Sequence, residues 1–157
     1  AISLLEPGDV LVANVGGYLE AGGWGEIATT ASMARGCVGY ICDGAVRDVE
    51  EVKELGFPVF ARAVSIKGTM KEQLGTINHP IELGGVTVLP GDIVVGDTDG
   101  IVVIPKDRAR EALELCKAKE VAESRIIDEL KKGKLTLELL GLEATLARKG
   151  LTEEAAD

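Results

Sequence analysis

The chain has 157 residues, a formal net charge of −9 and a sequence pI near 4.7. Phosphate recognition needs clustered Lys and Arg, and no basic stripe is present, so we expect no nucleic-acid partner. No apolar run reaches membrane length, so we expect no membrane association, and a chain of this size suits one domain with one core. Apolar residues make up 46% of the sequence but aromatic residues only 3%, which predicts a core of Val, Ile, Leu and Ala.

The three cysteines, Cys37, Cys42 and Cys116, are odd in number and form no CxxC pair. We therefore predict free thiols in a reducing compartment. Because the sequence shows no signal peptide, we expect a cytoplasmic protein. The only histidine, His79, is far from Cys42 in sequence, so we expect no catalytic thiol.

Strands and helices alternate in the first part of the chain. We predict strands at residues 10–13, 38–42 and 58–61, and helices at residues 26–35 and 48–55. Gly36 and Gly56 are placed to end the two helices. This order predicts an α/β fold with βαβ organisation and a partly parallel sheet.

The rest of the chain changes character twice. Residues 62–75 read as a long polar loop, and a loop of that length in a compact domain is often functional. We predict strands at residues 76–83, 86–89, 93–96 and 101–104, followed by helices at residues 106–132 and 137–148. A hairpin turn at residues 97–100 joins the last two strands, Thr136 is the expected cap of the last helix, and the acidic tail at residues 152–157 is expected to fray.

The most informative segment is Asp-Gly-Ala-Val-Arg-Asp-Val-Glu-Glu at residues 43–51, at a predicted strand-to-helix junction. Arg47 can hold a carboxylate substrate with its two-pronged guanidinium. Asp48 and Glu51 can hold a hard divalent cation or its waters. A second interpretation fits the same spacing, because Asp48 followed by Glu51 is also a helix capping box and Arg47 can form a surface ion pair.

A glycine-rich segment lies upstream and leads into the helix predicted from Glu26. Its glycines, Gly16, Gly17, Gly22, Gly23 and Gly25, allow a ligand to approach the backbone closely. The amides of Ile27 and Ala28 have no partner at a helix amino end and can receive a carboxylate. An ordinary glycine-rich turn is the alternative, whereas a phosphate loop fits poorly because no Gly-Lys-Ser or Gly-Lys-Thr follows.

Together these segments resemble the signature of the RraA-like superfamily: Gly25-Glu26, twenty intervening residues, Arg47-Asp48, two residues and Glu51. Further matching phrases, such as Pro7-Gly8-Asp9 and Gly84-Gly85-Val86, extend the resemblance over about residues 7–105. The resemblance implies a three-layer β/β/α sandwich of the swivelling-domain-like type. It also implies a catalytic core at residues 1–105 and a C-terminal helical extension at residues 106–157.

This superfamily includes the 4-hydroxy-4-methyl-2-oxoglutarate/4-carboxy-4-hydroxy-2-oxoadipate aldolases, which are class II pyruvate aldolases. It also includes the regulator of ribonuclease activity A and proteins mislabelled as demethylmenaquinone methyltransferases. The resemblance therefore implies a metal-dependent carbon–carbon lyase with oxaloacetate decarboxylase side activity. A non-catalytic regulator of an RNA-degrading endonuclease is the alternative function, and an inactive fragment is a third.

The resemblance also implies roles for single residues. Asp48 would ligate Mg²⁺ or Mn²⁺ directly, and Glu26 and Glu51 would hold metal-bound waters, although the aldolases often carry Asp at the position of Glu26. Arg47 would contact the pyruvoyl oxygens. The backbone of Gly25, Ile27 and Ala28 would take the substrate carboxylate.

One departure from the family concerns the beginning of the chain. Family members carry a further N-terminal segment before the Pro-Gly-Asp turn, and this sequence begins almost at that turn. A fragment, a natural short form and one piece of a split protein are all open explanations. The family places its site at a subunit interface, so we expect a homotrimer or homohexamer.

Overall fold

The structure is a computed structural model that describes residues 1–72 and 74–151, so the predicted frayed tail lies outside the described residues. The chain divides into two compact units, Ala1–Lys106 and Asp107–Asp157. The first unit contains every strand of the described residues and two helices, at Glu26–Met33 and Val49–Glu54.

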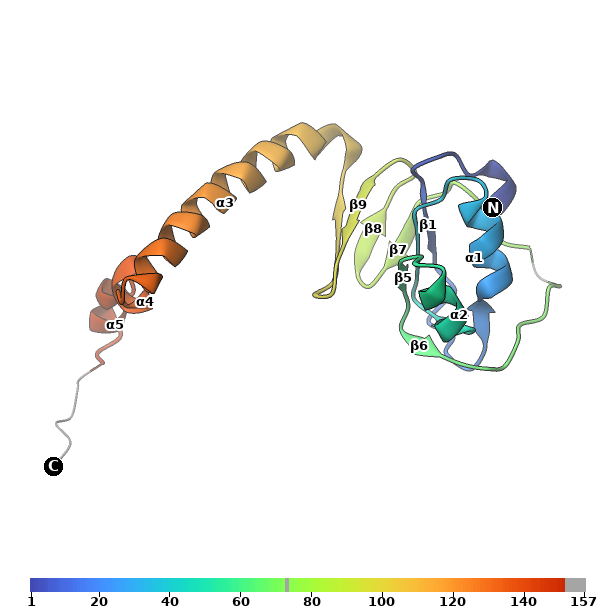
Figure 1. Ribbon diagram of the computed structural model, residues 1–157, viewed down its shortest axis with the longest axis horizontal. Coiled ribbons are helices and arrows are strands. Elements are labelled where there is room, and N and C mark those ends of the chain that lie inside the picture. The colour runs from blue at the N-terminus through green and yellow to red at the C-terminus, as the bar shows by residue number, and fades with distance from the viewer. Residues whose placement is uncertain (73, 152–157) are drawn as a thin grey trace, which may run out of the picture. The chain divides into compact units, whose positions relative to one another are not determined.

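Two three-stranded parallel sheets form the centre of the first unit (Figure 1). The first sheet has the order β1-β3-β5, with β1 at Val10–Ala13, β3 at Gly39–Cys42 and β5 at Val59–Phe60. The second has the order β2-β4-β6, with β2 at Gly22–Trp24, β4 at Ala45–Val46 and β6 at Ala63–Val64. The chain alternates between the sheets, so each strand of the first sheet is followed by the corresponding strand of the second.

Two helices connect these strand pairs. Helix α1 at Glu26–Met33 follows β2, and α2 at Val49–Glu54 follows β4. The helices contact each other, and α1 also contacts β2 and a 3₁₀ turn, η1, at Ile2–Leu4. At its carboxyl end α1 is two residues shorter than predicted, and α2 is one residue shorter than predicted at each end, which is the usual uncertainty of helix boundaries.

The core of the first unit is centred on aromatic side chains. The rings of Trp24 and Tyr40 stack with centroids 3.8 Å apart and planes 8° from parallel. Phe57 lies in the same buried cluster. Burial raises the pKa of Tyr40 well above its ordinary value, so its phenol stays neutral. The prediction of a purely aliphatic core was therefore wrong, because the few aromatic residues are concentrated at its centre.

A buried hydrogen bond fixes the tryptophan of this cluster. Trp24 Nε1 donates to Thr29 Oγ1 at 2.8 Å, and Thr29 is fully buried. Since Thr29 lies on α1 and Trp24 on β2, this bond holds the helix against the second sheet. Cys37 and Cys42 are buried free thiols in the same region, as predicted.

The second sheet was missed by the sequence analysis. Strands β4 and β6 are two residues long, and β2 is mostly glycine. Segments this short carry no alternation of apolar and polar residues, so nothing in them predicts a strand. They form strands because β2 and β6 both pair with β4.

Two antiparallel hairpins complete the first unit. Strands β7 at Ile81–Leu83 and β8 at Val86–Val88 form one, and β9 at Ile93–Gly96 and β10 at Ile101–Ile104 form the other. The predicted turn at residues 97–100 is confirmed: Asp97 Oδ1 accepts the amides of Asp99 at 2.8 Å and of Gly100 at 3.3 Å. The strand predicted from residue 76 begins only at Ile81.

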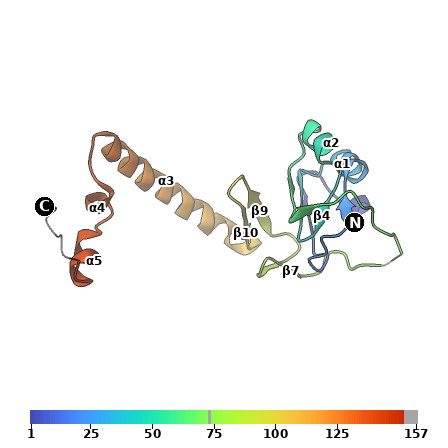
Figure 2. The same cartoon turned by 90° about the horizontal axis from the view of Figure 1, so that it is seen from below.

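The second unit is helical. After a 3₁₀ turn, η2, at Lys106–Arg108, it contains α3 at Ala109–Lys131, α4 at Thr136–Leu139 and α5 at Glu143–Arg148 (Figure 2). The single helix predicted for residues 137–148 is broken near Gly141, whose φ is +63°. Thr136 is the first residue of α4 and not its cap, which is Leu135. Within the described residues, no helix is both long and apolar enough to span a membrane.

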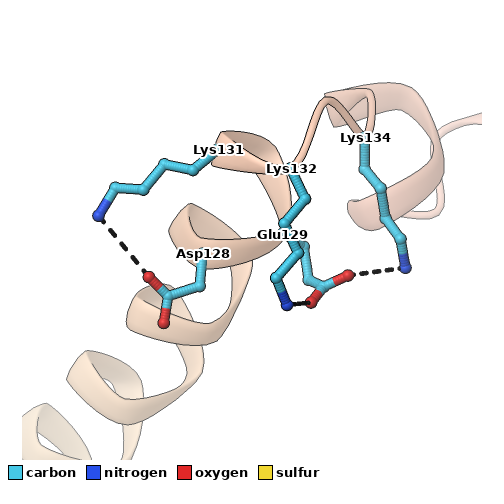
Figure 3. A network of polar contacts seen from close by, with 5 residues as sticks. All are labelled: Asp128, Glu129, Lys131, Lys132 and Lys134. Carbon is cyan, nitrogen blue, oxygen red and sulfur yellow. Dashed lines mark hydrogen bonds and ion pairs between the residues drawn. The ribbon is translucent and has the colours of Figure 1, made fainter.

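A cluster of charged side chains closes the carboxyl end of α3 (Figure 3). Glu129 accepts hydrogen bonds from Lys132 Nζ at 2.6 Å and lies 2.8 Å from Lys134 Nζ. Lysines in the last turn also interact favourably with the negative end of the helix dipole. The hydrogen bonds from Lys132 and then Lys134 lower the pKa of Glu129 below its ordinary value.

We predict that replacing Thr29 with Val destabilises the first unit by about 1–3 kcal/mol, because a buried Trp24 N–H loses its acceptor while the side-chain shape is kept. Urea unfolding followed by the fluorescence of Trp24, the sole tryptophan, measures this change. Thr30→Val on the exposed side of α1 is the control and should change stability by less than about 0.5 kcal/mol. Equal effects of the two substitutions would show that the buried hydrogen bond contributes nothing.

We predict a pH dependence at the carboxyl end of α3. Because the folded pKa of Glu129 lies below its ordinary value of 4.5, the stabilisation is present above that value and is lost as the pH falls through the folded pKa. A ¹³C titration of the Glu129 carboxyl group should give a low pKa, which Lys132→Ala raises. Lys117→Ala, which removes an equivalent ion pair with Glu114, should leave it unchanged. An ordinary pKa for Glu129 in the unmodified chain would contradict the prediction.

Candidate functional site

The two segments singled out in the sequence meet at one edge of the second sheet. Strands β2 and β4 are parallel neighbours, so their carboxyl ends lie side by side. Gly25-Glu26 follows the first of these ends and Arg47-Asp48 follows the second. In open α/β sheets, ligands bind in the crevice outside the carboxyl ends of the strands, which makes this edge the candidate site.

Asp48 makes the contact that joins the two segments. Its Oδ2 accepts the backbone amide of Glu26 at 3.1 Å. Asp48 occupies the N-cap position of α2 with φ +52° and makes no side-chain capping bond to that helix. The capping-box interpretation is therefore wrong for this residue, because its carboxylate faces the amino end of α1. A positive φ is uncommon outside glycine, and such backbone strain is concentrated at functional sites.

Two of the upstream glycines leave room for the side chains of Arg47 and Asp48. A Cβ added at Gly25 would overlap Asp48 Oδ2 and would lie 2.9 Å from Arg47 Cγ. A Cβ added at Gly22 would lie 2.8 Å from Arg47 Cβ. These glycines therefore let the side chains of Arg47 and Asp48 lie directly on the backbone of β2 and its continuation.

The guanidinium group of Arg47 is held in place but is not fully paired. Its Nε lies 3.5 Å from Asp48 Oδ2, and both side chains are a little over one-third exposed. That Nε atom is itself buried and has no hydrogen-bond acceptor within the described part of the chain. A buried donor without an acceptor is costly, but this atom is closed to a ligand from solvent, so an incoming carboxylate would reach only the exposed part of the guanidinium.

The loop after β6 covers the same guanidinium, and the sequence analysis did not foresee this. A Cβ at Gly68 would lie 2.9 Å from Arg47 Nη1. The amide of Gly22 donates to Lys67 O at 2.8 Å, which attaches the beginning of this loop to β2. The length of the polar segment at residues 62–75 was the only sequence signal for a role here.

At the amino end of α1, two amides have no acceptor within the described part of the chain. The first intrahelical bond runs from the amide of Thr29 to Gly25 O at 3.0 Å. The amides of Ile27 and Ala28 precede it and have no intrahelical acceptor, whereas Asp48 occupies the amide of Glu26. Two donors at the positive end of the helix dipole thus remain for an anion.

The donor set of this chain can hold only a weakly coordinated metal. Among the described residues, no three His, Cys, Asp or Glu side chains lie close enough to surround an ion. Glu26 and Glu51 are exposed, and Asp48 offers one carboxylate whose Oδ2 is already engaged. A single carboxylate with retained waters fits Mg²⁺, which gives up its water ligands reluctantly.

A cavity of about 340 Å³ lies near the site but is not the site. Its walls are mostly apolar, and Arg47, Lys53 and Arg62 also line it. None of the three acidic candidates, Glu26, Asp48 and Glu51, lines this cavity. The candidate site is therefore the open edge where β2 and β4 end.

We predict that Gly25→Ala lowers the free energy of unfolding by about 1–3 kcal/mol, because the new methyl group overlaps the Asp48 carboxylate. Gly23→Ala is the control, since its Cβ would lie 3.8 Å from Thr69 Cγ2, an ordinary contact. Denaturant unfolding measures both effects, and the ¹³C shift of the Asp48 carboxyl group should change only in Gly25→Ala. A larger effect of Gly23→Ala would show that the close approach of the Asp48 carboxylate is not the reason for glycine at Gly25.

Comparison with known proteins identifies relatives over the first unit and beyond it. Residues 1–103 match the family model RraA-like, described as Aldolase/RraA. A protein of Halalkalibacterium halodurans, provisionally named a 4-hydroxy-4-methyl-2-oxoglutarate aldolase, is 40% identical over 114 residues, which are 73% of this chain and 54% of that protein. A protein of Thermus thermophilus named 4-hydroxy-4-methyl-2-oxoglutarate aldolase is 34% identical over 99 residues, 63% of this chain and 60% of that protein.

Solved structures show the same relationship. An uncharacterized protein from Pseudomonas syringae is 31% identical with a TM-score of 0.81, covering 88% of this chain and 70% of that one. A structure titled as the RNA-processing inhibitor RraA, from Thermus, is 34% identical with a TM-score of 0.62, covering 64% of this chain and 62% of that one. This chain thus spans little more than half the length of the named aldolases, and on the family match and these structures it belongs to the RraA-like family.

Proposed function

We propose that this chain carries the pyruvate-handling site of a divalent-metal-dependent class II aldolase. Its substrates would be 4-hydroxy-2-oxo acids of the 4-hydroxy-4-methyl-2-oxoglutarate type. One observation carries the proposal: Arg47 and Asp48, at the end of β4, meet the amino end of α1 through the Asp48–Glu26 contact. The names of the aldolase relatives support the same class of reaction.

Substrate binding would use donors that are free at this edge. The amides of Ile27 and Ala28, beside Gly25, receive the carboxylate of the oxo acid and are assisted by the helix dipole. The guanidinium of Arg47 donates to the oxygen of the neighbouring 2-oxo group. These contacts fix the oxo-acid end of the substrate at the carboxyl end of the second sheet.

The bond change is a retro-aldol cleavage. A proton leaves the C4 hydroxyl group, the C3–C4 bond breaks, and its electron pair forms the enolate of pyruvate. Negative charge then develops on the C2 oxygen, where Arg47 stabilises it more strongly than in the substrate. Glu26 orients the water that accepts the hydroxyl proton, and protonation at C3 completes pyruvate. Loss of CO₂ from oxaloacetate leaves the same enolate, so decarboxylation is the proposed side activity.

The proposed metal is Mg²⁺ or Mn²⁺, with Asp48 as its protein ligand and Glu26 and Glu51 as partners of its waters. When bound, the cation supplies Lewis-acid stabilisation of the developing charge, worth several kcal/mol. The Asp48 carboxylate also lies beside Arg47 and keeps the guanidinium directed at the site.

We further propose that the working protein is a homotrimer or homohexamer in the cytoplasm. Apolar side chains near the site are strongly exposed, with Ile27 80%, Ile66 96% and Met70 85% exposed. Exposed apolar clusters of this kind mark contact surfaces, so a neighbouring subunit would complete the site and hold the distal part of the substrate. The buried free thiols Cys37 and Cys42 suit a reducing compartment.

A second candidate function is a non-catalytic regulator of an RNA-degrading endonuclease. The similar structure titled as an RNA-processing inhibitor favours it. A pure binder has no need of a carboxylate held at the amino end of α1, so the Asp48–Glu26 contact favours the enzyme.

We predict that pyruvate release from 4-hydroxy-4-methyl-2-oxoglutarate or oxaloacetate requires Mg²⁺ or Mn²⁺ and stops with EDTA. Asp48→Asn should lower kcat/KM by about 100-fold or more, and Arg47→Lys by about 10- to 100-fold because the planar fork is lost. Asp99→Asn in the distant hairpin turn and Arg35→Lys in the turn after α1 should change kcat/KM less than about twofold.

An assembled sample that melts cooperatively, turns over neither oxo acid with either metal and retains an RNA-degrading endonuclease would support the regulator and contradict the aldolase. Sizing of the purified chain, together with its melting curve, identifies an inactive fragment. Such a fragment would be monomeric and would lack a cooperative transition.

A further inference from the structure

The loop between β1 and β2 is fastened to the chain by an internal carboxylate. The amides of Val15 and Gly17 donate to Asp43 Oδ1 at 2.6 Å and Oδ2 at 2.8 Å. Gly16 and Gly17 both have left-handed backbones, with φ of +68° and +69°. This turn points the amides of Val15 and Gly17 toward the half-buried Asp43 side chain, while the Gly16 amide between them donates to Asn14 Oδ1 at 2.8 Å. The amides of these two glycines thus have acceptors within the chain.

The loop fits closely against the segment that carries Asp43. A Cβ added at Gly44 would lie 2.9 Å from Tyr18 O and closer still to Val15 Cγ2. The amide of Ala45, in β4, donates to Tyr18 O at 3.3 Å. Asp43 thus anchors the loop at the point where β3 passes into β4.

The same loop leads into β2, whose carboxyl end forms part of the candidate site. Glu20 O accepts the hydroxyl of Ser65 at 2.8 Å, and the amide of Gly22 donates to Lys67 O at 2.8 Å. The start of β2 is therefore bonded directly to the loop after β6, and the segment that leads into it is bonded to Asp43 through Val15 and Gly17.

Arg47 rests on this fastened segment. Its amide donates to Trp24 O in β2 at 2.8 Å. Its Cβ lies against Gly22, and its Nη1 lies against Gly68, which forms a parallel bridge with Gly22. The position of the guanidinium therefore depends on where the backbone of β2 begins.

We infer that Asp43 is a positioning residue for Arg47, acting through the loop at residues 15–21 and the start of β2. Its carboxylate does not contact the site. It fixes the loop by two charge-assisted hydrogen bonds, and the loop fixes the strand on which Arg47 lies. The expected change in catalysis rests on the function proposed above, whereas the expected change in hydrogen exchange at β2 and Arg47 does not.

The test is Asp43→Asn, which replaces one acceptor oxygen by an NH₂ group facing a backbone N–H. Asp92→Asn is the control, because Asp92 also accepts two backbone amides, those of Leu89 at 2.9 Å and Lys106 at 3.2 Å, in a turn remote from β2 in the chain. Native-state hydrogen exchange should become about tenfold faster at the amides of Gly22 and Arg47 in Asp43→Asn and stay unchanged in Asp92→Asn. Exchange that changes only at Val15 and Gly17 would overturn the inference.

Kinetics give the second measurement. Because Arg47 is proposed to stabilise the enolate more strongly than the substrate, Asp43→Asn should lower kcat for the oxo acid about fivefold or more, with a smaller change in KM. Ser65→Ala cuts the bond to Glu20 O while leaving Asp43 in place, so it should produce part of the same fall in kcat and covers the case in which Asp43→Asn does not fold. An unchanged kcat in an active enzyme would overturn the inference. If the unmodified protein turns over no oxo acid, the aldolase proposal fails and the exchange measurement still decides the role of Asp43.

Discussion

The hydrogen bond between the Glu26 amide and the Asp48 carboxylate is the contact on which the site depends. It joins residues 22 positions apart in sequence and forms only because β2 and β4 are parallel neighbours. The bond requires an uncommon backbone conformation at Asp48 and the absence of a side chain at Gly25. Each condition restricts the sequence, and uncommon backbone conformations of this kind are concentrated at functional sites.

The alternation between two sheets explains how so small a unit assembles this edge. Each strand of the first sheet is followed by a short strand of the second sheet. Because β2, β4 and β6 are parallel, their carboxyl ends lie at the same edge of the second sheet. The stacked rings of Trp24 and Tyr40 belong to β2 and β3, and they connect the second sheet to the first. Packing at the core therefore supports the position of the site directly.

The relatives of this chain carry names from two functional classes, and the fold alone cannot choose between them. A shared fold supports many functions, so an enzyme and a regulator of this fold differ in the arrangement of particular groups. The Arg47 side chain is a little over one-third exposed, and the amides of Ile27 and Ala28 at the amino end of α1 have no acceptor within the described residues. Exposed cationic and amide donors of this kind suit a small carboxylic acid.

The sequence by itself determined the α/β class, the long strands such as β1, β9 and β10, the hairpin turn at Asp97, and the residues from which the candidate site is built. These features follow from local patterns of apolar residues and turn chemistry, which act over a few positions. Only the tertiary structure decided four other features: the existence of the second sheet, the direction of the Asp48 carboxylate, the hydrogen bonds from the Val15 and Gly17 amides to Asp43, and the contact of Gly68 with Arg47. Each depends on pairing between segments distant in sequence, where a two-residue strand or a glycine has no local preference that a pattern could reveal.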